Sequence, residues 1–158
     1  MPVAEIAAPA DTLAFCLSKG LGAPIGSMLC GPAALVARAR RFRHMLGGGW
    51  RQAGVLAAAG LWALDHHVER LADDHRRARA LAEAIDASGR ARVLAKPETN
   101  IVLFEPEGGA EASAAMERVL AARGVLVAGV YGSVLRAVTH LDVDDAGIGR
   151  AIEAFRTP

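Results

Sequence analysis

Residues 12–27 read Thr-Leu-Ala-Phe-Cys-Leu-Ser-Lys-Gly-Leu-Gly-Ala-Pro-Ile-Gly-Ser and carry the strongest structural signal in this sequence. The apolar run 12–17 is short and stops sharply at Ser18, which predicts a strand buried on both faces. The three glycines and one proline that follow exclude a regular element and predict a loop. Ligands of parallel α/β sheets bind just outside the carboxyl ends of strands, so this loop is a predicted ligand site.

Lys19 opens this loop and is one of two lysines among the 18 basic residues, the other being Lys96. An amine partly removed from water can lose its proton and attack a carbonyl, which a guanidinium cannot do. Lys19 is therefore a candidate nucleophile, and Ser18 beside it could hydrogen-bond a phosphate or the amine. The alternative is a surface lysine in an ordinary turn.

The composition excludes several classes of protein. A chain of 158 residues that is 53% hydrophobic and 22% charged can bury a core and is not disordered. Its net charge of +1 argues against a nucleic-acid partner. Cys16 and Cys30 lack the spacing of a zinc site, so no metal and no disulfide framework are expected. The longest apolar run, 53–64, is roughly 12 residues, short of the ~20 that span a bilayer, and no signal peptide is visible, so a cytoplasmic protein is expected.

The rest of the chain alternates helix and strand signals. Residues 27–30 predict a second strand, and 33–45 a basic helix that Pro32 begins. Residues 52–88 predict one long helix or two abutting helices, apolar all round and buried as far as Leu64 and amphipathic beyond it. After a stop at 88–89, strands are expected at 93–95, 100–104, 125–128 and 134–139, and helices at 111–123 and, capped by Asp144, through 155. The order ββαββα predicts a small sheet with two helices on one face.

Two arginines stand out by their surroundings. Arg51 follows the glycine run 47–49 at a predicted helix start, where backbone amides and a guanidinium together favour a phosphate or carboxylate. An ordinary turn between helices is the alternative. Arg136 interrupts an apolar strand, where a charge is costly unless it is paired, and a substrate carboxylate is one possible partner. An edge-strand arginine facing water is the other.

The histidines carry a weaker signal. His66, His67 and His75 lie on the charged half of the long helical segment, and their spacing does not place three ligands on one helical face. A solvated surface is therefore expected there rather than a metal site. For His140, the end of a strand and the neighbourhood of the site both stay open.

Three segments, in order, resemble parts of low-specificity L-threonine aldolases. Residues 18–27 resemble the cofactor-lysine segment, and residues 43–54, Arg-His-Met-Leu-Gly-Gly-Gly-Trp-Arg-Gln-Ala-Gly, and 135–140, Leu-Arg-Ala-Val-Thr-His, continue the match in register. The similarity covers essentially the whole chain. It identifies a resemblance to the aromatic amino acid β-eliminating lyase/threonine aldolase family, whose members depend on pyridoxal 5'-phosphate and have the aspartate-aminotransferase fold, fold type I.

The resemblance implies a role for each candidate residue. Lys19 would be the catalytic lysine that holds pyridoxal phosphate covalently, with Ser18 and Arg51 also binding the cofactor. Arg51 would lie near the phosphate and reach the site of a neighbouring subunit. Arg136 would bind the α-carboxylate of a small β-hydroxy amino acid. No metal is implied, and the full-length family forms homo-oligomers, dimers or tetramers.

The sequence departs from the family pattern in two ways. His44 stands where a lysine is usual and Trp50 where a methionine is common, which puts the substrate preference in doubt. Family members are also much longer, and their N-terminal half supplies the phosphate cradle, the ring stacked on the pyridine and the aspartate at its nitrogen. The base that removes the β-hydroxyl proton generally belongs to that half, so no base is assigned here.

Together with the alternating helix and strand signals, the resemblance therefore implies an α/β chain that is the C-terminal part of fold type I. Residues 1–88 are expected to form the end of the large-domain sheet with a long connecting helix, and residues 89–158 a small α+β domain. The predicted function is pyridoxal-phosphate-dependent cleavage of L-threonine or L-allo-threonine to glycine and acetaldehyde, by a fragment that needs its missing N-terminal half. The alternatives are a non-catalytic remnant or interaction module, or a related β-eliminating lyase for another β-hydroxy amino acid.

Overall fold

The structure is a computed structural model that describes residues 2–157. The chain forms two compact units, with the division between Val68 and Glu69. The sequence predicts a domain boundary at residue 88, which lies at the other end of helix α4 (Leu71–Ala87). Helix α4, which lies between the two positions, belongs with the second unit because it packs on strands β3 and β4 and helix α6 of that unit. None of the described helices is long and apolar enough to cross a membrane.

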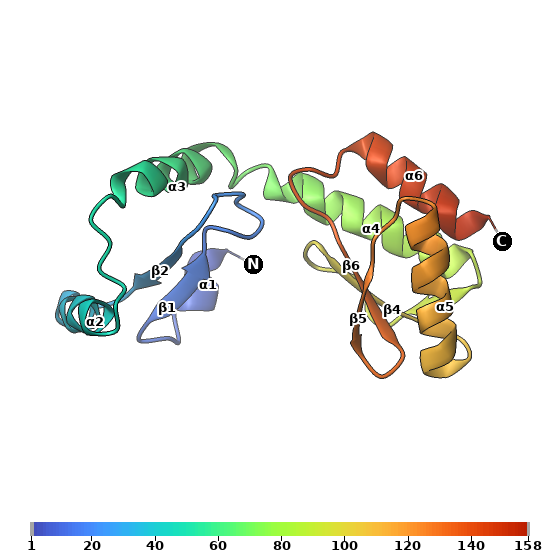
Figure 1. Ribbon diagram of the computed structural model, residues 1–158, viewed down its shortest axis with the longest axis horizontal. Coiled ribbons are helices and arrows are strands. Elements are labelled where there is room, and N and C mark those ends of the chain that lie inside the picture. Colours follow the sequence, from blue (N-terminus) through green and yellow to red (C-terminus); the bar gives the residue numbers. More distant parts are fainter. Residues whose placement is uncertain (1, 158) are drawn as a thin grey trace. The chain divides into compact units, whose positions relative to one another are not determined.

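The first unit contains the strand and loop expected around Lys19. Strand β1 (Leu13–Cys16) pairs antiparallel with β2 (Ser27–Cys30), with Leu13 opposite Cys30 (Figure 1). The helices of this unit are α1 (Val3–Ala7), α2 (Ala33–Met45) and α3 (Gly54–His66). Helix α2 has the predicted bounds, and the predicted helical segment 52–88 is two helices, α3 and α4, separated by residues 67–70.

Two segments of the first unit are less buried within residues 2–157 than their apolar sequences predict. The side chains of β1 alternate between half-buried and exposed, because a two-stranded pair has no layer covering both of its faces within residues 2–157. Helix α3 is not buried all round either, since Val55 is 78% exposed and Leu61 63% exposed. Only the stripe of Gly60 and Ala63 is buried. The first unit therefore presents large apolar side chains to solvent.

We expect the purified 158-residue chain to self-associate, because exposed apolar surface of this extent drives association. Light scattering should report a mass well above the 16.4 kDa of one chain. The double variant Val55→Lys/Leu61→Lys should shift the distribution toward the monomer, whereas Arg38→Lys on α2 should leave it unchanged. A monodisperse monomer of the unmodified chain would contradict the expectation.

The second unit is an antiparallel sheet covered by helices. Its strands run in the order β3-β4-β6-β5. The elements are β3 (Ala91–Val93), β4 (Ile101–Pro106), α5 (Gly109–Ala122), β5 (Ala128–Tyr131), β6 (Val134–Val138) and α6 (Asp145–Arg156). The predicted ββαββα order is confirmed. Strand β5 begins three residues later than predicted, because Val125 still closes the end of α5 by donating its N–H to the Leu120 carbonyl at 2.9 Å.

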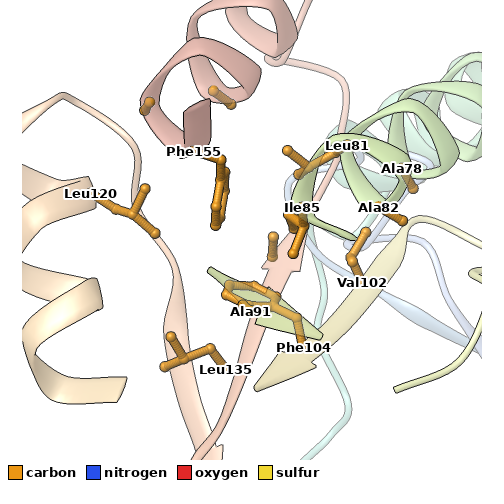
Figure 2. Packing of buried hydrophobic residues seen from close by; sticks show 13 residues of the cluster. Ala78, Leu81, Ala82, Ile85, Ala91, Val102, Phe104, Leu120, Leu135 and Phe155 are labelled. Carbon is orange, nitrogen blue, oxygen red and sulfur yellow. The ribbon is translucent and has the colours of Figure 1, made fainter. Parts of the chain in front are cut away.

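The core of the second unit lies on one face of this sheet. Phe104 of β4 and Phe155 of α6 meet edge to face, with ring centroids 5.5 Å apart and an interplanar angle of 82°. Ile85 of α4 and Leu120 of α5 join the same buried cluster (Figure 2). Helices α4, α5 and α6 therefore all contribute to covering this face, where the sequence predicted two helices.

The opposite face of the sheet carries a different set of side chains. Successive residues of a strand point to opposite faces, and along β6 Leu135 and Ala137 are buried while Arg136 and Val138 are exposed. In register, Arg136 lies opposite Leu103 of β4. Arg136 is thus on a central strand rather than an edge strand, on the face that the helices of the second unit leave uncovered.

A buried polar cluster joins α4 to the ends of β4 and β6. The Asp74 side chain is fully buried, and its Oδ1 accepts a hydrogen bond from Arg70 Nη2 at 2.6 Å. Thr139 Oγ1 donates to the Asp74 carbonyl at 2.7 Å, and Asn100 Nδ2 donates to the Thr139 carbonyl at 2.7 Å. Asp74 Oδ2 and Arg70 Nη1 are buried and have no hydrogen-bond partner among the described residues, so the pair is only partly satisfied.

Helix α6 begins as predicted. Asp144 caps it, accepting a hydrogen bond from the Gly147 N–H at 2.7 Å. The next residue, Asp145, accepts hydrogen bonds from Arg77 at 2.8 Å and from Arg76 at 3.1 Å. These bonds, that from Arg77 above all, lower the pKa of Asp145 below its usual value of 3.8.

The lowered pKa of Asp145 predicts how the stability of the folded chain changes with pH. The folded chain favours ionised Asp145, so the stabilisation is present above the usual pKa and is lost as the pH falls through the lowered pKa. Asp145→Asn should therefore be less stable than the unmodified chain at about pH 6, and the difference should shrink toward about pH 2. Urea unfolding followed by circular dichroism at several pH values measures it. A difference that grows as the pH falls would contradict the assignment.

Candidate active site

The loop after β1 is held at its base while Lys19 points outward. The Leu17 N–H donates to the Gly26 carbonyl at 2.9 Å, and the Ala23 N–H donates to the Leu17 carbonyl at 3.0 Å. The Gly22 N–H, at a positive φ of 71° that suits glycine, donates to the Lys19 carbonyl at 2.8 Å. The Ser18 and Lys19 side chains are both exposed. The loop thus presents a primary amine beside a hydroxyl on a fixed backbone.

The glycine run before Arg51 forms a tight turn after α2. Gly47 has a φ of 79°, and the Gly48 N–H donates to the Arg43 carbonyl at 2.7 Å. A Cβ at Gly48 would approach Arg43 Cγ to 2.7 Å, and one at Gly49 would collide with the His44 ring. Gly47 is thus favoured by its positive φ and Gly48 and Gly49 by close neighbours, and Arg51 lies in the exposed turn that leads to α3.

The predicted site residues are divided between the two units. Ser18 and Lys19 lie next to each other in one loop, and Arg51 belongs to the same unit. Arg136 lies in the second unit, on the uncovered face of its sheet. Among residues 2–157, no hydrogen bond or ion pair is found for the side chains of Lys19, Arg51 or Arg136. All three charged groups are thus available to a ligand.

The prediction for His67 is wrong. His66 is exposed, as expected, but His67 is 9% exposed and its Nδ1 lies 2.6 Å from the Leu21 carbonyl oxygen, in the Lys19 loop. The sequence contained a signal for this burial. Positions 60, 63 and 67 recur at helical spacing, which places His67 on the same stripe as the buried Gly60 and Ala63. The solvated surface was predicted because charged residues surround the histidines in the sequence.

The donor set of the first unit fits pyridoxal phosphate. An exposed primary amine is the group that attaches to an aldehyde, and a hydroxyl together with a guanidinium suits a phosphate. The Ser18 hydroxyl lies beside the amine of Lys19, and among residues 2–157 neither this amine nor the guanidinium of Arg51 has a side-chain partner. Nothing in the described loop blocks access to the amine, since Lys19 and its neighbours Ser18 and Gly22 are exposed or half-buried.

The fold of this chain is part of the pyridoxal-phosphate-dependent fold type I. A solved structure of a putative L-allo-threonine aldolase from Listeria monocytogenes superposes on 99% of the chain with a TM-score of 0.78 and 16% sequence identity, over 46% of that structure's own chain. The model of the beta-eliminating lyase family matches residues 1–107. The chain belongs to the beta-eliminating lyase family.

Two curated relatives extend the match along the sequence. A probable low-specificity L-threonine aldolase of Arabidopsis thaliana is 42% identical over 98% of this chain, and this region is 44% of the relative. The low specificity L-threonine aldolase of Escherichia coli K12 is 44% identical over 88% of the chain and 40% of the relative. The chain therefore spans less than half the length of the curated relatives it matches.

Proposed function

We propose that this chain provides the lysine-bearing part of a pyridoxal-phosphate-dependent lyase that cleaves L-threonine or L-allo-threonine to glycine and acetaldehyde. The observation that carries the proposal is the exposed amine of Lys19, which has no partner among the described residues and extends from a fixed loop within the region matched by the beta-eliminating lyase family. The relatives named threonine aldolases support the choice of substrate. The predicted division at residue 88 remains part of this proposal: residues 1–88 would come from the large cofactor-binding domain and residues 89–158 from the small domain, with α4 packing on the sheet of the small domain.

In this proposal each charged side chain has one task. Lys19 would hold the cofactor covalently through its amine. Ser18 and Arg51 bind the cofactor, and Arg136 holds the substrate carboxylate and so fixes the orientation of the Cα–Cβ bond. When bound, pyridoxal phosphate supplies an electron sink for the electron pair left on Cα as that bond breaks.

Co-expression tests the proposed function. The chain alone should bind pyridoxal phosphate poorly, because only part of the electrostatic environment that catalysis needs is present in it. Co-expression with the part of the E. coli relative that precedes the matched region should give an assembled enzyme. This enzyme should release acetaldehyde from L-threonine, and borohydride reduction followed by peptide mapping should find the cofactor on Lys19 and not on Lys96. An assembled enzyme that carries no cofactor on Lys19 and cleaves no β-hydroxy amino acid would instead support a non-catalytic remnant.

Arg136→Lys in the assembled enzyme should weaken amino-acid binding more than cofactor binding. A two-point guanidinium–carboxylate contact would become a point-charge contact, a loss of about 1–3 kcal/mol, the scale of a charged hydrogen bond. The KM for L-threonine should rise while cofactor affinity stays unchanged. Arg92→Lys is the matched control, since Arg92 lies on β3 of the same sheet and pairs with Glu105 at 3.4 Å. An unchanged KM and kcat for Arg136→Lys would refute the assignment.

A further inference from the structure

One buried ionisable side chain of the first unit has no task in the proposed chemistry. His67 is the C-cap residue that follows α3, its ring stands edge-on to Trp62 at a centroid distance of 4.8 Å, and its Nδ1 lies 2.6 Å from the Leu21 carbonyl oxygen. A carbonyl oxygen can only accept a hydrogen bond, so Nδ1 must carry a proton in this contact. The imidazole therefore acts as a donor that is held in one orientation.

The partner of His67 lies in the loop that carries Lys19. Leu21 is buried, two residues after Lys19, and its carbonyl is the group that His67 binds. On the other side of Lys19, the buried side chain of Leu17 packs against Gly60 of α3. The approach is close, because a Cβ added at Gly60 would lie 3.0 Å from Leu17 Cδ1. Helix α3 and its C-cap residue His67 thus contact the chain on both sides of Lys19, at Leu17 before it and at Leu21 after it.

We propose that His67 is a positioning residue for Lys19, which holds the loop against the end of α3 through the Leu21 carbonyl. His67 contacts neither the amine nor any reacting atom. It fixes the backbone from which the amine extends, so the amine meets the cofactor from one direction. The proposal that His67 holds the loop stands on the contact itself, and its consequence for catalysis rests on the proposed role of Lys19.

Three substitutions separate this role from packing. His67→Asn keeps a donor near the position of Nδ1, because the asparagine amide nitrogen is attached at the same branch point of the side chain. His67→Leu keeps the apolar volume and removes the donor. His66→Leu is the matched control on the adjacent residue, since His66 is exposed and its Nδ1 contacts the Trp62 carbonyl of its own helix at 2.8 Å.

The first measurement is amide hydrogen exchange in the 158-residue chain, which requires no activity. In His67→Leu, the Gly22 and Ala23 amides should exchange about tenfold faster, the effect of leaving a buried carbonyl without its partner. The β1 and β2 amides should exchange at the unmodified rate. His67→Asn and His66→Leu should both resemble the unmodified chain. Unchanged loop exchange in His67→Leu, or equally fast exchange in His67→Asn, would overturn the proposal.

The second measurement uses the assembled enzyme and pyridoxal phosphate with borohydride. Lys96, in the second unit, serves as an internal reference for the labelling of Lys19. The Lys19:Lys96 ratio at subsaturating cofactor should fall in His67→Leu and recover in His67→Asn, and a general loss of stability would not produce this pattern. Equal ratios in all variants would overturn the positioning role. Failure of the unmodified enzyme to label Lys19 would overturn the proposed function alone, while the exchange measurement would still decide the contact.

Discussion

Lys19→Arg in the assembled enzyme is expected to abolish covalent attachment of the cofactor and to lower turnover of L-threonine by about 10⁴- to 10⁶-fold, the scale seen when a covalent catalytic group is removed. Arginine keeps the positive charge and the length of the side chain. Its guanidinium stays protonated and cannot form the covalent link that an amine forms. The loop itself should be unaffected, because its hydrogen bonds come from the backbone and from His67.

The control for this variant is the second lysine of the chain. Lys96 lies in an exposed position of the second unit, so Lys96→Arg should leave turnover and cofactor content unchanged. Absorbance of the bound cofactor and acetaldehyde release report the two properties separately. Substantial turnover in Lys19→Arg together with loss of turnover in Lys96→Arg would contradict this assignment and indicate that Lys96 holds the cofactor.

Asp74→Ala is expected to lower the free energy of unfolding of the second unit by about 3–5 kcal/mol, the cost of removing one partner of a buried ion pair. The Arg70 side chain is 18% exposed and that of Arg77 13% exposed, so both arginines would keep much of their burial and lose a carboxylate. Because the pair is only partly satisfied, the lower end of the range is expected. Hydrogen exchange of the β4 and β6 amides measures the effect within the whole chain.

The adjacent residue provides the comparison for Asp74. Asp73 is of the same type and on the same helix, but its side chain is 53% exposed and pairs with Arg76 at 3.5 Å. Asp73→Ala should change stability by less than about 1 kcal/mol, as is usual for exposed ion pairs. Equal effects of the two substitutions would contradict the structural role of the buried cluster.

Local sequence signals predicted those parts of the fold that depend on residues close together in the chain, such as helix starts and the order of the elements. Helix α2 follows from Pro32 and a regular apolar stripe, and the Asp144 cap follows from a side chain that bonds an amide three residues later. The ββαββα order follows from alternating runs and glycine stops. Strand β1 and helix α3 are not fully buried within residues 2–157, because an apolar run shows that a surface can be buried and not what covers it.

The candidate site was predicted in part, for the same reason. Lys19 could be singled out because a loop after a strand and a background poor in lysine are visible in the sequence. The contact between His67 and Leu21 joins residues 46 positions apart, and no local pattern encodes that pairing. The buried cluster of Asp74, Thr139 and Asn100 likewise depends on three segments that meet only in the folded chain.

The fixed backbone around Lys19 has a consequence for conformational entropy. Ordering one flexible residue costs about 1–2 kcal/mol for its backbone, and ordering a long side chain such as lysine costs up to about 2 kcal/mol more. In the loop after β1, the hydrogen bonds of Leu17, Lys19 and Leu21 order the backbone when the chain folds, so ligand binding does not add this entropy cost. Binding a ligand at the amine would then restrict only the rotamers of one side chain, so more of the intrinsic interaction energy would appear as affinity.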